Sequence, residues 1–192
     1  MGRAYTETMF SEAAKRYQQQ HGSRLQYERA AERGPTQEAL GPMERDFIAR
    51  RDSFYLASIT EDGWPYVQHR GGPQGFLRVL DGRTLAFADF SGNKQFITAG
   101  NLATNDRVSL LLMDYPHQAR LKIIGHARVV EGDKELEAKV RVADYPARVE
   151  WVIAIDVVGF DWNCSQHIIP RWTSEEIQAV MGTGRSGRGM KV

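Results

Sequence analysis

The segment from Phe87 to Lys94 contains residue types suited to binding an anion. A strand-like run ends there and a helix is predicted to start. Free N–H groups at a helix start and the positive end of the helix dipole attract negative charge, and Lys94 adds a full positive charge. These features indicate a phosphate site. In the alternative interpretation, Ser91 or Asn93 only caps the helix and Lys94 is solvated.

A second cationic feature lies on a predicted strand from 119 to 130. Arg120 and Lys122 alternate with apolar residues there, so both side chains are expected on one face of the sheet. Two neighbouring cations repel each other unless they are solvated or matched by an anion. The pair therefore indicates either a solvent-facing strand or, together with Lys94, an anion-binding site.

A third feature is the strand end His69-Arg70, which is followed by Gly71-Gly72-Pro73. Glycines allow a ligand to approach the backbone closely, although the same pair could form a bend in a curved strand. The segment is not a P-loop, because the Gly-Lys-Ser/Thr ending is missing.

A fourth feature follows the last predicted strand, where an aromatic ring, two amides and a histidine gather between Trp162 and Ile168. Cys164 and His167 could be metal ligands, but two ligands do not make a site. They could also form a nucleophile pair, although such pairs usually meet through the fold and not from neighbouring positions.

The first 50 residues are expected to form a helical arm. Apolar residues at 10, 13, 14 and 17 follow one helix stripe, and a second short helix is predicted to start at Pro42 and to bury Met43 and Phe47. The arm has too few large apolar residues to fold alone.

From Ser53 onward the pattern is that of β-structure. Asp62-Gly63 and Asp81-Gly82 each separate two strand-like runs, which predicts two tight hairpins with positive φ at both central residues. Thr173-Ser174-Glu175-Glu176 forms a capping box that predicts a short final helix. The other expected helices cover 94–102 and 133–143, and the expected strands cover 54–59, 64–70, 76–80, 84–90, 107–114, 119–130 and 150–160.

These elements predict a mainly β protein with helices (α+β), in which six or seven antiparallel strands form a small barrel behind the N-terminal arm. We expect three regions: the arm (1–50), a barrel domain (51–181) and a disordered tail (182–192) that holds four glycines and no acids.

Composition excludes several classes of protein. A hydrophobic share of 42% and a charged share of 26% are typical of a folded chain. The net charge of +1 argues against nucleic acid or an anionic membrane as partner. The single cysteine excludes an intramolecular disulfide. The chain has no apolar stretch of the roughly 20 residues that a membrane helix needs and no signal-like start, so we expect a cytoplasmic protein.

The order of these features resembles the pyridoxamine 5′-phosphate oxidase-like flavoproteins, a family of FMN-binding split β-barrels. The resemblance covers roughly residues 45–172 and includes Asn101-Leu102-Ala103, Ala119–Gly125 and Phe160–Asn163. It implies FMN as cofactor, with the phosphate held by the strand-to-helix segment and a basic strand. It also implies a homodimer in which the C-terminal segment of a second subunit completes the pocket.

The resemblance carries cofactor contacts onto particular residues. Lys94 matches the phosphate-binding lysine, Arg120 and Lys122 match positions on the basic strand, and Trp162-Asn163 matches a Trp-Gln pair. The full set of expected cofactor-binding residues is Gln68, His69, Arg70, Gly71, Phe87, Ala88, Asp89, Ser91, Asn93, Lys94, Arg120, Lys122, Trp162, Asn163, Gln166 and His167.

Two departures from the oxidase pattern argue against pyridoxamine phosphate as substrate. Gly71-Gly72-Pro73 replaces an aliphatic run ending in lysine, and Gln166-His167-Ile168 replaces an Arg-Leu-His substrate clamp. The sequence therefore resembles the broader branch of the family. We expect a flavin-dependent oxidoreductase that uses a small-molecule electron donor and acceptor, with no catalytic residue assigned. The alternatives are a non-catalytic flavin sensor or store, and the same barrel with haem or a deazaflavin.

Overall fold

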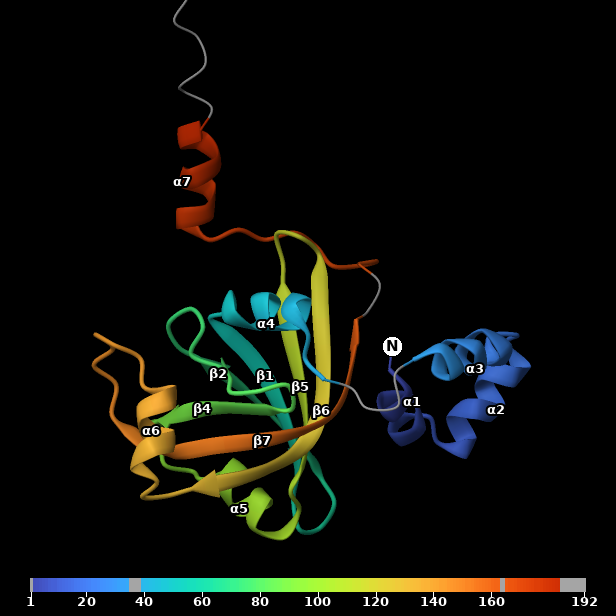
Figure 1. Ribbon diagram of the computed structural model, residues 1–192, viewed down its shortest axis with the longest axis horizontal. Helices are drawn as coiled ribbons and strands as arrows, with labels where there is room; N and C mark the ends of the chain where they lie inside the picture. The colour runs from blue at the N-terminus through green and yellow to red at the C-terminus, as the bar shows by residue number, and fades with distance from the viewer. Residues whose placement is uncertain (1, 35–38, 163–164, 184–192) are drawn as a thin grey trace, which may run out of the picture.

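The computed structural model describes residues 2–34, 39–162 and 165–183 and confirms the predicted α+β class (Figure 1). Its seven strands form one antiparallel sheet in the order β2-β1-β5-β6-β7-β4-β3, which bends around the core as a split barrel. The strands are β1 (Ser53–Ile59), β2 (Pro65–Gly71), β3 (Arg78–Val79), β4 (Thr84–Phe90), β5 (Arg107–Asp114), β6 (Ala119–Val130) and β7 (Val149–Trp162).

The core lies inside this bend. Phe54 packs against Phe76 and Phe87, and all three rings are fully buried. The two longest strands, β6 and β7, change register at Gly125, where an added Cβ would lie 2.5 Å from the backbone oxygen of Asp156. A glycine is therefore required at this irregularity, which allows the long strand pair to bend around the core.

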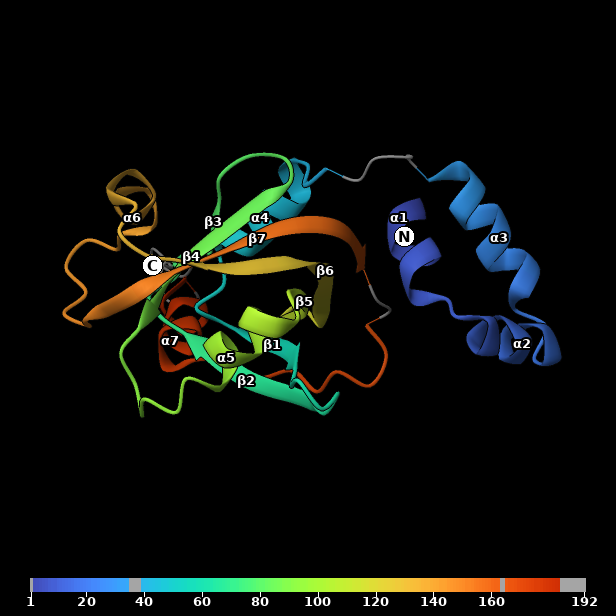
Figure 2. The same cartoon turned by 90° about the horizontal axis from the view of Figure 1, so that it is seen from below.

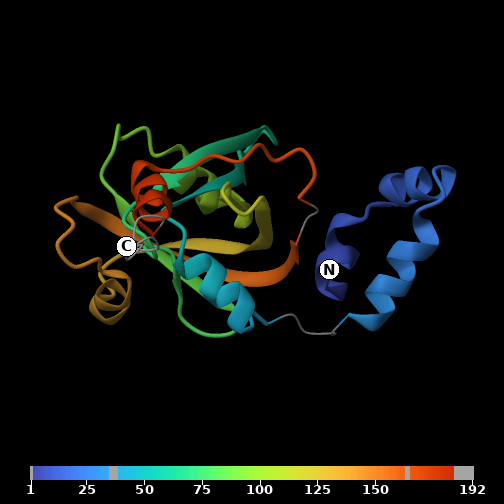
Figure 3. The same ribbon diagram turned by 90° about the horizontal axis from the view of Figure 1, so that it is seen from above.

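Seven helices surround the sheet in the part of the chain that the structure describes: α1 (Arg3–Met9), α2 (Glu12–Gln20), α3 (Arg24–Arg33), α4 (Pro42–Ala49), α5 (Ile97–Thr104), α6 (Lys134–Val140) and α7 (Ser174–Thr183). The arm α1–α3 lies to one side of the barrel, and α1 contacts β7 (Figures 1 and 3). The last helix, α7, projects from the barrel (Figure 1) and is amphipathic, with Ile177 and Met181 exposed. The α4 helix packs into the barrel through Phe47 and Ile48. The division into an arm (1–50), a barrel domain (51–181) and a tail (182–192) stays a prediction.

Several local predictions are wrong for identifiable reasons. The apolar stripe at 10–17 crosses a helix break, because Ser11 caps α2 and its side chain accepts a hydrogen bond from Ala14 N at 3.2 Å. Met43 is 62% exposed, whereas Phe47 is buried as expected. The run 76–80 pairs only at Arg78–Val79, because Phe76 and Leu77 turn into the core before the strand begins.

The hairpin turns also differ from the expectation. Of the four Asp and Gly residues in the two turns, only Gly63 has a positive φ, at 86°. Both loops are longer than a two-residue turn, since Thr60 N donates to Trp64 O and Leu80 N donates to Thr84 O. The capping box is confirmed: Thr173 N donates to Glu176 Oε2 at 2.7 Å, and Glu176 N donates to Thr173 Oγ1 at 3.2 Å.

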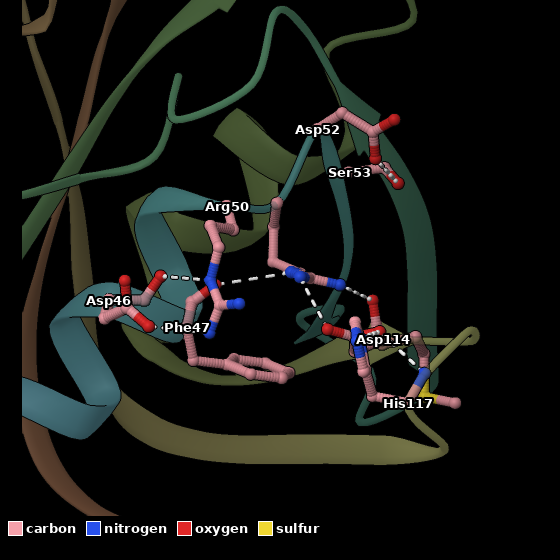
Figure 4. Close-up of polar contacts among 9 residues, drawn as sticks. Asp46, Phe47, Arg50, Asp52, Ser53, Asp114 and His117 are labelled. Atoms are coloured by element: carbon pink, nitrogen blue, oxygen red, sulfur yellow. Dashed lines mark hydrogen bonds and ion pairs between the residues drawn. The ribbon is translucent and has the colours of Figure 1, made fainter. Parts of the chain in front are cut away.

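A buried ion pair joins the end of α4 to the end of β5 (Figure 4). Arg51 donates to Asp114 Oδ2 at 2.7 Å and to Met113 O at 3.0 Å, and its backbone oxygen accepts from Gly75 N. Burial alone would raise the pKa of Asp114, but hydrogen bonds from the backbone and ring of His117, together with the charge of Arg51, lower the pKa instead. The backbone bonds from Gly72 N to Asp52 O and from Gly75 N to Arg51 O hold the loop 72–75, which follows β2, against the segment after α4.

Replacing Arg51 by leucine is expected to lower the free energy of unfolding by about 3 kcal/mol at neutral pH, because the buried Asp114 carboxylate loses its cation. The control Arg50→Leu removes an exposed pair with Asp46 and should cost less than about 0.5 kcal/mol. Urea denaturation measures both variants.

The effect of Arg51→Leu should depend on pH. Because the folded-state pKa of Asp114 is below its ordinary value of 3.8, its stabilising contribution is full above about pH 4 and is lost as the pH falls below that value. The stability gap between wild type and Arg51→Leu should therefore narrow in acid. Equal losses for Arg50→Leu and Arg51→Leu would contradict this assignment.

Candidate functional site

A pocket of roughly 180 Å³ lies where β2, the end of β4 and the start of β7 meet the first turn of α5. Figure 1 shows β4 and β7 side by side with α5 below them, and Figure 2 shows α5 next to β2. Five predicted cofactor residues line this pocket: Gln68, Arg70, Asp89, Asn93 and Lys94. The structure therefore brings together the strand-to-helix segment and the early strand, which lie some twenty residues apart in the sequence.

The loop between β4 and α5 differs from the expected direct entry into a helix. The helix begins at Ile97 and not at Lys94, and its N-cap residue Phe96 makes no side-chain cap. Asn93 does not cap the helix either, because its Oδ1 accepts a hydrogen bond from Gln95 N at 3.1 Å. Lys94 and Phe96 both adopt left-handed backbone conformations, with φ of 58° and 53°. Such conformations are unfavourable outside glycine and often occur at functional sites.

Arg70 and Asp89 form a mostly buried ion pair in the wall of the pocket. Arg70 Nη1 donates to Asp89 Oδ1, and Trp151 Nε1 donates to Asp89 Oδ2 at 3.0 Å. Strand pairing sets this arrangement, because Asp89 on β4 lies directly opposite Trp151 on β7. Burial raises the pKa of Asp89 above its ordinary value, while Arg70 and the Trp151 hydrogen bond oppose the rise.

Buried polar atoms without a hydrogen-bond partner are concentrated at this pocket. Among the residues that the structure describes, three such side-chain atoms occur: Arg70 Nε, Thr98 Oγ1 and Glu150 Oε1. All three residues line the pocket. Leaving a buried polar group unpaired costs about 1–3 kcal/mol, so three at one place indicate groups that a ligand would satisfy.

An adjoining hollow of roughly 150 Å³ shares the side chains of Gln68, Arg70 and Asp89 and is also lined by His69, Gly71, Phe87 and Ala88. Rings of the same chain occupy the space beside Gly71, the last residue of β2, and Gly72, which follows it. A Cβ on Gly71 would lie 3.0 Å from the His69 ring, and one on Gly72 would lie 2.8 Å from the Phe76 ring. Of the two interpretations of this pair, the packed bend therefore accounts for Gly72.

Other predicted residues lie away from the pocket within one chain. Lys122 Nζ is 3.4 Å from Asp161 Oδ2 and lies over the Tyr5 ring of α1. Trp162 Nε1 donates to Glu44 Oε1 at 2.8 Å and the indole packs on Phe47. Arg120, Gln166, His167 and Ser91 do not line the pocket either. Asn163 falls outside the described residues, as does Cys164.

The expected cofactor residues omit nine of the residues that line the pocket, among them Thr98, Glu150 and Trp151. Thr98 lies within the helix predicted over 94–102 and in the first turn of α5, so its place in that helix was a usable signal. Glu150 and Trp151 begin a strand that was predicted, but only its pairing with β4 reveals that it borders the pocket.

In the described part of the chain, no group of three or more His, Cys, Asp or Glu side chains could hold a metal ion. Within the same residues, no helix has the length and apolarity to cross a bilayer.

Replacing Trp151 by phenylalanine is expected to lower the free energy of unfolding by about 1.5–3 kcal/mol at neutral pH, because Asp89 loses a hydrogen bond to its charged form. The pKa of Asp89 in the folded protein is above its ordinary value of 3.8. The contribution of Asp89 to the free energy of unfolding therefore falls as the pH rises from 3.8 through that pKa. Losing the indole raises the pKa of Asp89 further. The loss of stability in Trp151→Phe relative to the wild type should therefore grow from pH 4 to pH 7. Denaturation at both pH values measures it. A pH-independent deficit, or an equal one for the exposed control Trp64→Phe, would contradict this account.

Comparison with solved structures places the fold. HupZ of Group A Streptococcus superposes with a TM-score of 0.53 at 16% sequence identity, over 69% of this chain and 98% of that chain. A putative pyridoxamine 5′-phosphate oxidase from Lactobacillus delbrueckii superposes with a TM-score of 0.51 at 20% identity, over 66% and 96% of the two chains. At these identities the likeness establishes the fold alone.

The sequence itself identifies the family. No curated protein matches the chain, but the family profile described as "Pyridoxamine 5'-phosphate oxidase" matches residues 40–162. That stretch runs from the residue before the α4 cap to the end of β7 and contains every strand of the sheet. The chain therefore belongs to the pyridoxamine 5′-phosphate oxidase family, as the order of its sequence motifs predicts.

Proposed function

We propose that this protein binds FMN and acts as a flavin-dependent oxidoreductase. The observation that carries the proposal is the pocket beside Lys94, which is lined by all three unpartnered buried polar atoms of the described chain. An isolated strained loop could be a local accident of packing. Here the strained loop occurs together with the exposed Lys94, the uncapped start of α5 and unpartnered buried atoms on β2, α5 and β7. This combination favours a site built for a ligand.

The donors at one end of the pocket suit the phosphate of FMN. The first N–H groups of α5 lack a side-chain cap, and Thr98, in the first turn, has a buried hydroxyl without a partner. Lys94 is exposed at the pocket rim. A helix start, a hydroxyl and an ammonium group form a common cradle for a phosphate. The residues present therefore fit this part of the cofactor.

The size of the pocket favours a site completed by a second subunit. Ligand pockets usually enclose about 300–1,000 Å³, whereas this one has roughly 180 Å³. The outer face of β1, β2 and β5 carries exposed or half-exposed apolar side chains, including Tyr55, Val67 and Leu111. We propose that a second copy covers this face in a homodimer and that Arg120 and Lys122 reach the cofactor across the interface. The indole of Trp162 is engaged by Glu44 and Phe47 within its own chain.

FMN, when bound, carries hydride and single electrons between a small-molecule donor and an acceptor. The chain's own groups position it: Lys94 and the α5 start hold the anionic end, and the Arg70–Asp89 pair places a fixed positive group in the wall. Pyridoxamine phosphate is not the proposed substrate, because Gln166-His167-Ile168 stands where the oxidase has its clamp. The cytoplasmic location stays a prediction.

Replacing Lys94 by alanine is expected to weaken FMN binding about tenfold to a hundredfold, since a charge-assisted hydrogen bond contributes about 1.5–3 kcal/mol. Quenching of flavin fluorescence on titration measures the dissociation constant. The control Lys134→Ala removes a lysine whose side chain is 90% exposed on α6 and should bind FMN as the wild type does. Unchanged affinity in Lys94→Ala would show that the phosphate is held elsewhere, and uptake of haem or a deazaflavin in place of FMN would overturn the cofactor.

A mixing experiment tests the shared site. We expect Lys94→Ala and Arg120→Ala each to bind FMN poorly, and a refolded mixture of the two to recover binding. A mixed dimer has one site with both residues intact if Lys94 acts from one subunit and Arg120 from the other. Sedimentation velocity should show a dimer for each protein. Failure to recover binding in the mixture would contradict a site shared in this way.

A further inference from the structure

One feature of the pocket is not explained by phosphate binding. A site for an anion contains two carboxylates, Asp89 and Glu150, in its wall. Asp89 is already used, because one oxygen accepts from Arg70 and the other from Trp151. Glu150 is different, since its Oε1 is buried and has no hydrogen-bond partner.

The backbone turns Glu150 toward the pocket. Along a regular strand, consecutive side chains point to opposite faces of the sheet. In β7, however, Asp89 pairs with Trp151 while the next residue, Phe90, pairs with Val149, so Glu150 is an extra residue without a partner on β4. A bulge of this kind redirects a side chain and is over-represented next to active sites. It allows Glu150 and Trp151 to line the same pocket.

We propose that Glu150, assisted by Thr98, accepts a hydrogen bond from a donor group of the ligand, and that the pocket thereby selects ligands that carry such a donor near their anionic end. The inference rests on the proposed function. In FMN, the donors near the phosphate are the ribityl hydroxyls, whereas the N3–H of the pyrimidine ring lies at the opposite end of the molecule. The carboxylate of Glu150 cannot be satisfied by a fully ionised phosphate group, which offers it only acceptor oxygens.

The same argument identifies ligands that the pocket disfavours. Arg70 Nε–H needs an acceptor, Glu150 Oε1 needs a donor, and Thr98 Oγ1 can supply either. Sulfate or a porphyrin with two ionised carboxylates presents only acceptors near these groups and leaves Glu150 unpaired. Glu150 is therefore a specificity-determining residue, which separates a hydroxylated phosphate ligand from a simple anion.

The test compares FMN binding by the wild type, Glu150→Leu and Glu150→Gln, using fluorescence quenching. We expect Glu150→Leu to weaken FMN binding about tenfold or more. Glu150→Gln should retain most of the affinity, because its amide oxygen still accepts. The exposed Glu61→Leu in the first hairpin serves as the matched control and should bind FMN as the wild type does. Sulfate should compete with FMN at least as strongly in Glu150→Leu as in the wild type, because the nearby negative charge is gone.

Two FMN analogues locate the donor and also test the assignment if Glu150→Leu does not fold. FMN methylated at N3 lacks the ring donor, and FMN with a ribityl hydroxyl replaced by hydrogen lacks a chain donor. The analogue that lacks the ribityl hydroxyl should bind the wild type about as weakly as FMN binds Glu150→Leu, and should lose no further affinity in Glu150→Leu. The N3-methylated analogue should show the same difference between the wild type and Glu150→Leu as FMN does. In Glu150→Gln, the difference in affinity between FMN and the analogue that lacks the ribityl hydroxyl should be smaller than it is in the wild type.

Two results would overturn the assignment while leaving the proposed function intact: wild-type affinity of Glu150→Leu for FMN, or equal binding of FMN and every donor-lacking analogue by the wild type. A parallel loss of sulfate binding in Glu150→Leu would also overturn it, because that result would indicate a general collapse of the pocket. If the wild type does not bind FMN at all, the proposed function fails and this inference fails with it.

Discussion

The pairing of β4 with β7 is the constraint on which the pocket depends. These strands are joined residue by residue from Thr84 to Asp89, and their register places Asp89 opposite Trp151. The side chains that face inward from the same pairing, among them Leu85, Phe87 and Ile153, are buried in the core. A slip by one residue would move this apolar set to the other face of the sheet. The position of the functional groups is thus fixed by the same burial that stabilises the barrel.

The edge strand β2 is connected to this pair by charge. Its inward face is polar, with Gln68 held by the hydroxyl of Tyr66 and Arg70 held by Asp89. An edge strand without a full apolar face gains less from hydrophobic burial, so the Arg70–Asp89 contact helps to define where it lies. The pocket between β2 and α5 therefore has one wall set by packing and one set by an ion pair.

Local patterns in the sequence predicted much of this fold. The strands at 84–90, 107–114 and 119–130 have the predicted bounds, because each combines apolar alternation or a continuous apolar run with a clear turn at its ends. The run 76–80 shows the limit of that signal: Phe76 and Leu77 are apolar because they fill the core, and apolarity indicates burial more directly than strand pairing. Met43 was predicted to be buried, but α4 has only eight residues and buries one stripe through Phe47 and Ile48.

The candidate site was predictable where its signal is local and not where it depends on distant pairing. The strand-to-helix loop with Asn93 and Lys94 was found from residue types alone. Glu150 and Trp151 could not be found in this way, because they border the pocket only through a register set across some sixty residues of chain. Trp162 shows that a local signal can also mislead. Its place in the sequence matches a cofactor-binding residue of the family, but its indole donates to Glu44 on α4 in the same chain.

The central claim is that this pocket holds FMN. The most direct measurement is the visible absorption spectrum of the purified full-length protein after incubation with FMN and removal of free ligand, followed by identification of the ligand that heat releases. The account predicts an oxidised-flavin spectrum that stays with the protein and FMN in the released fraction. A protein that remains colourless after this treatment, or that retains a different chromophore in preference to FMN, would contradict it.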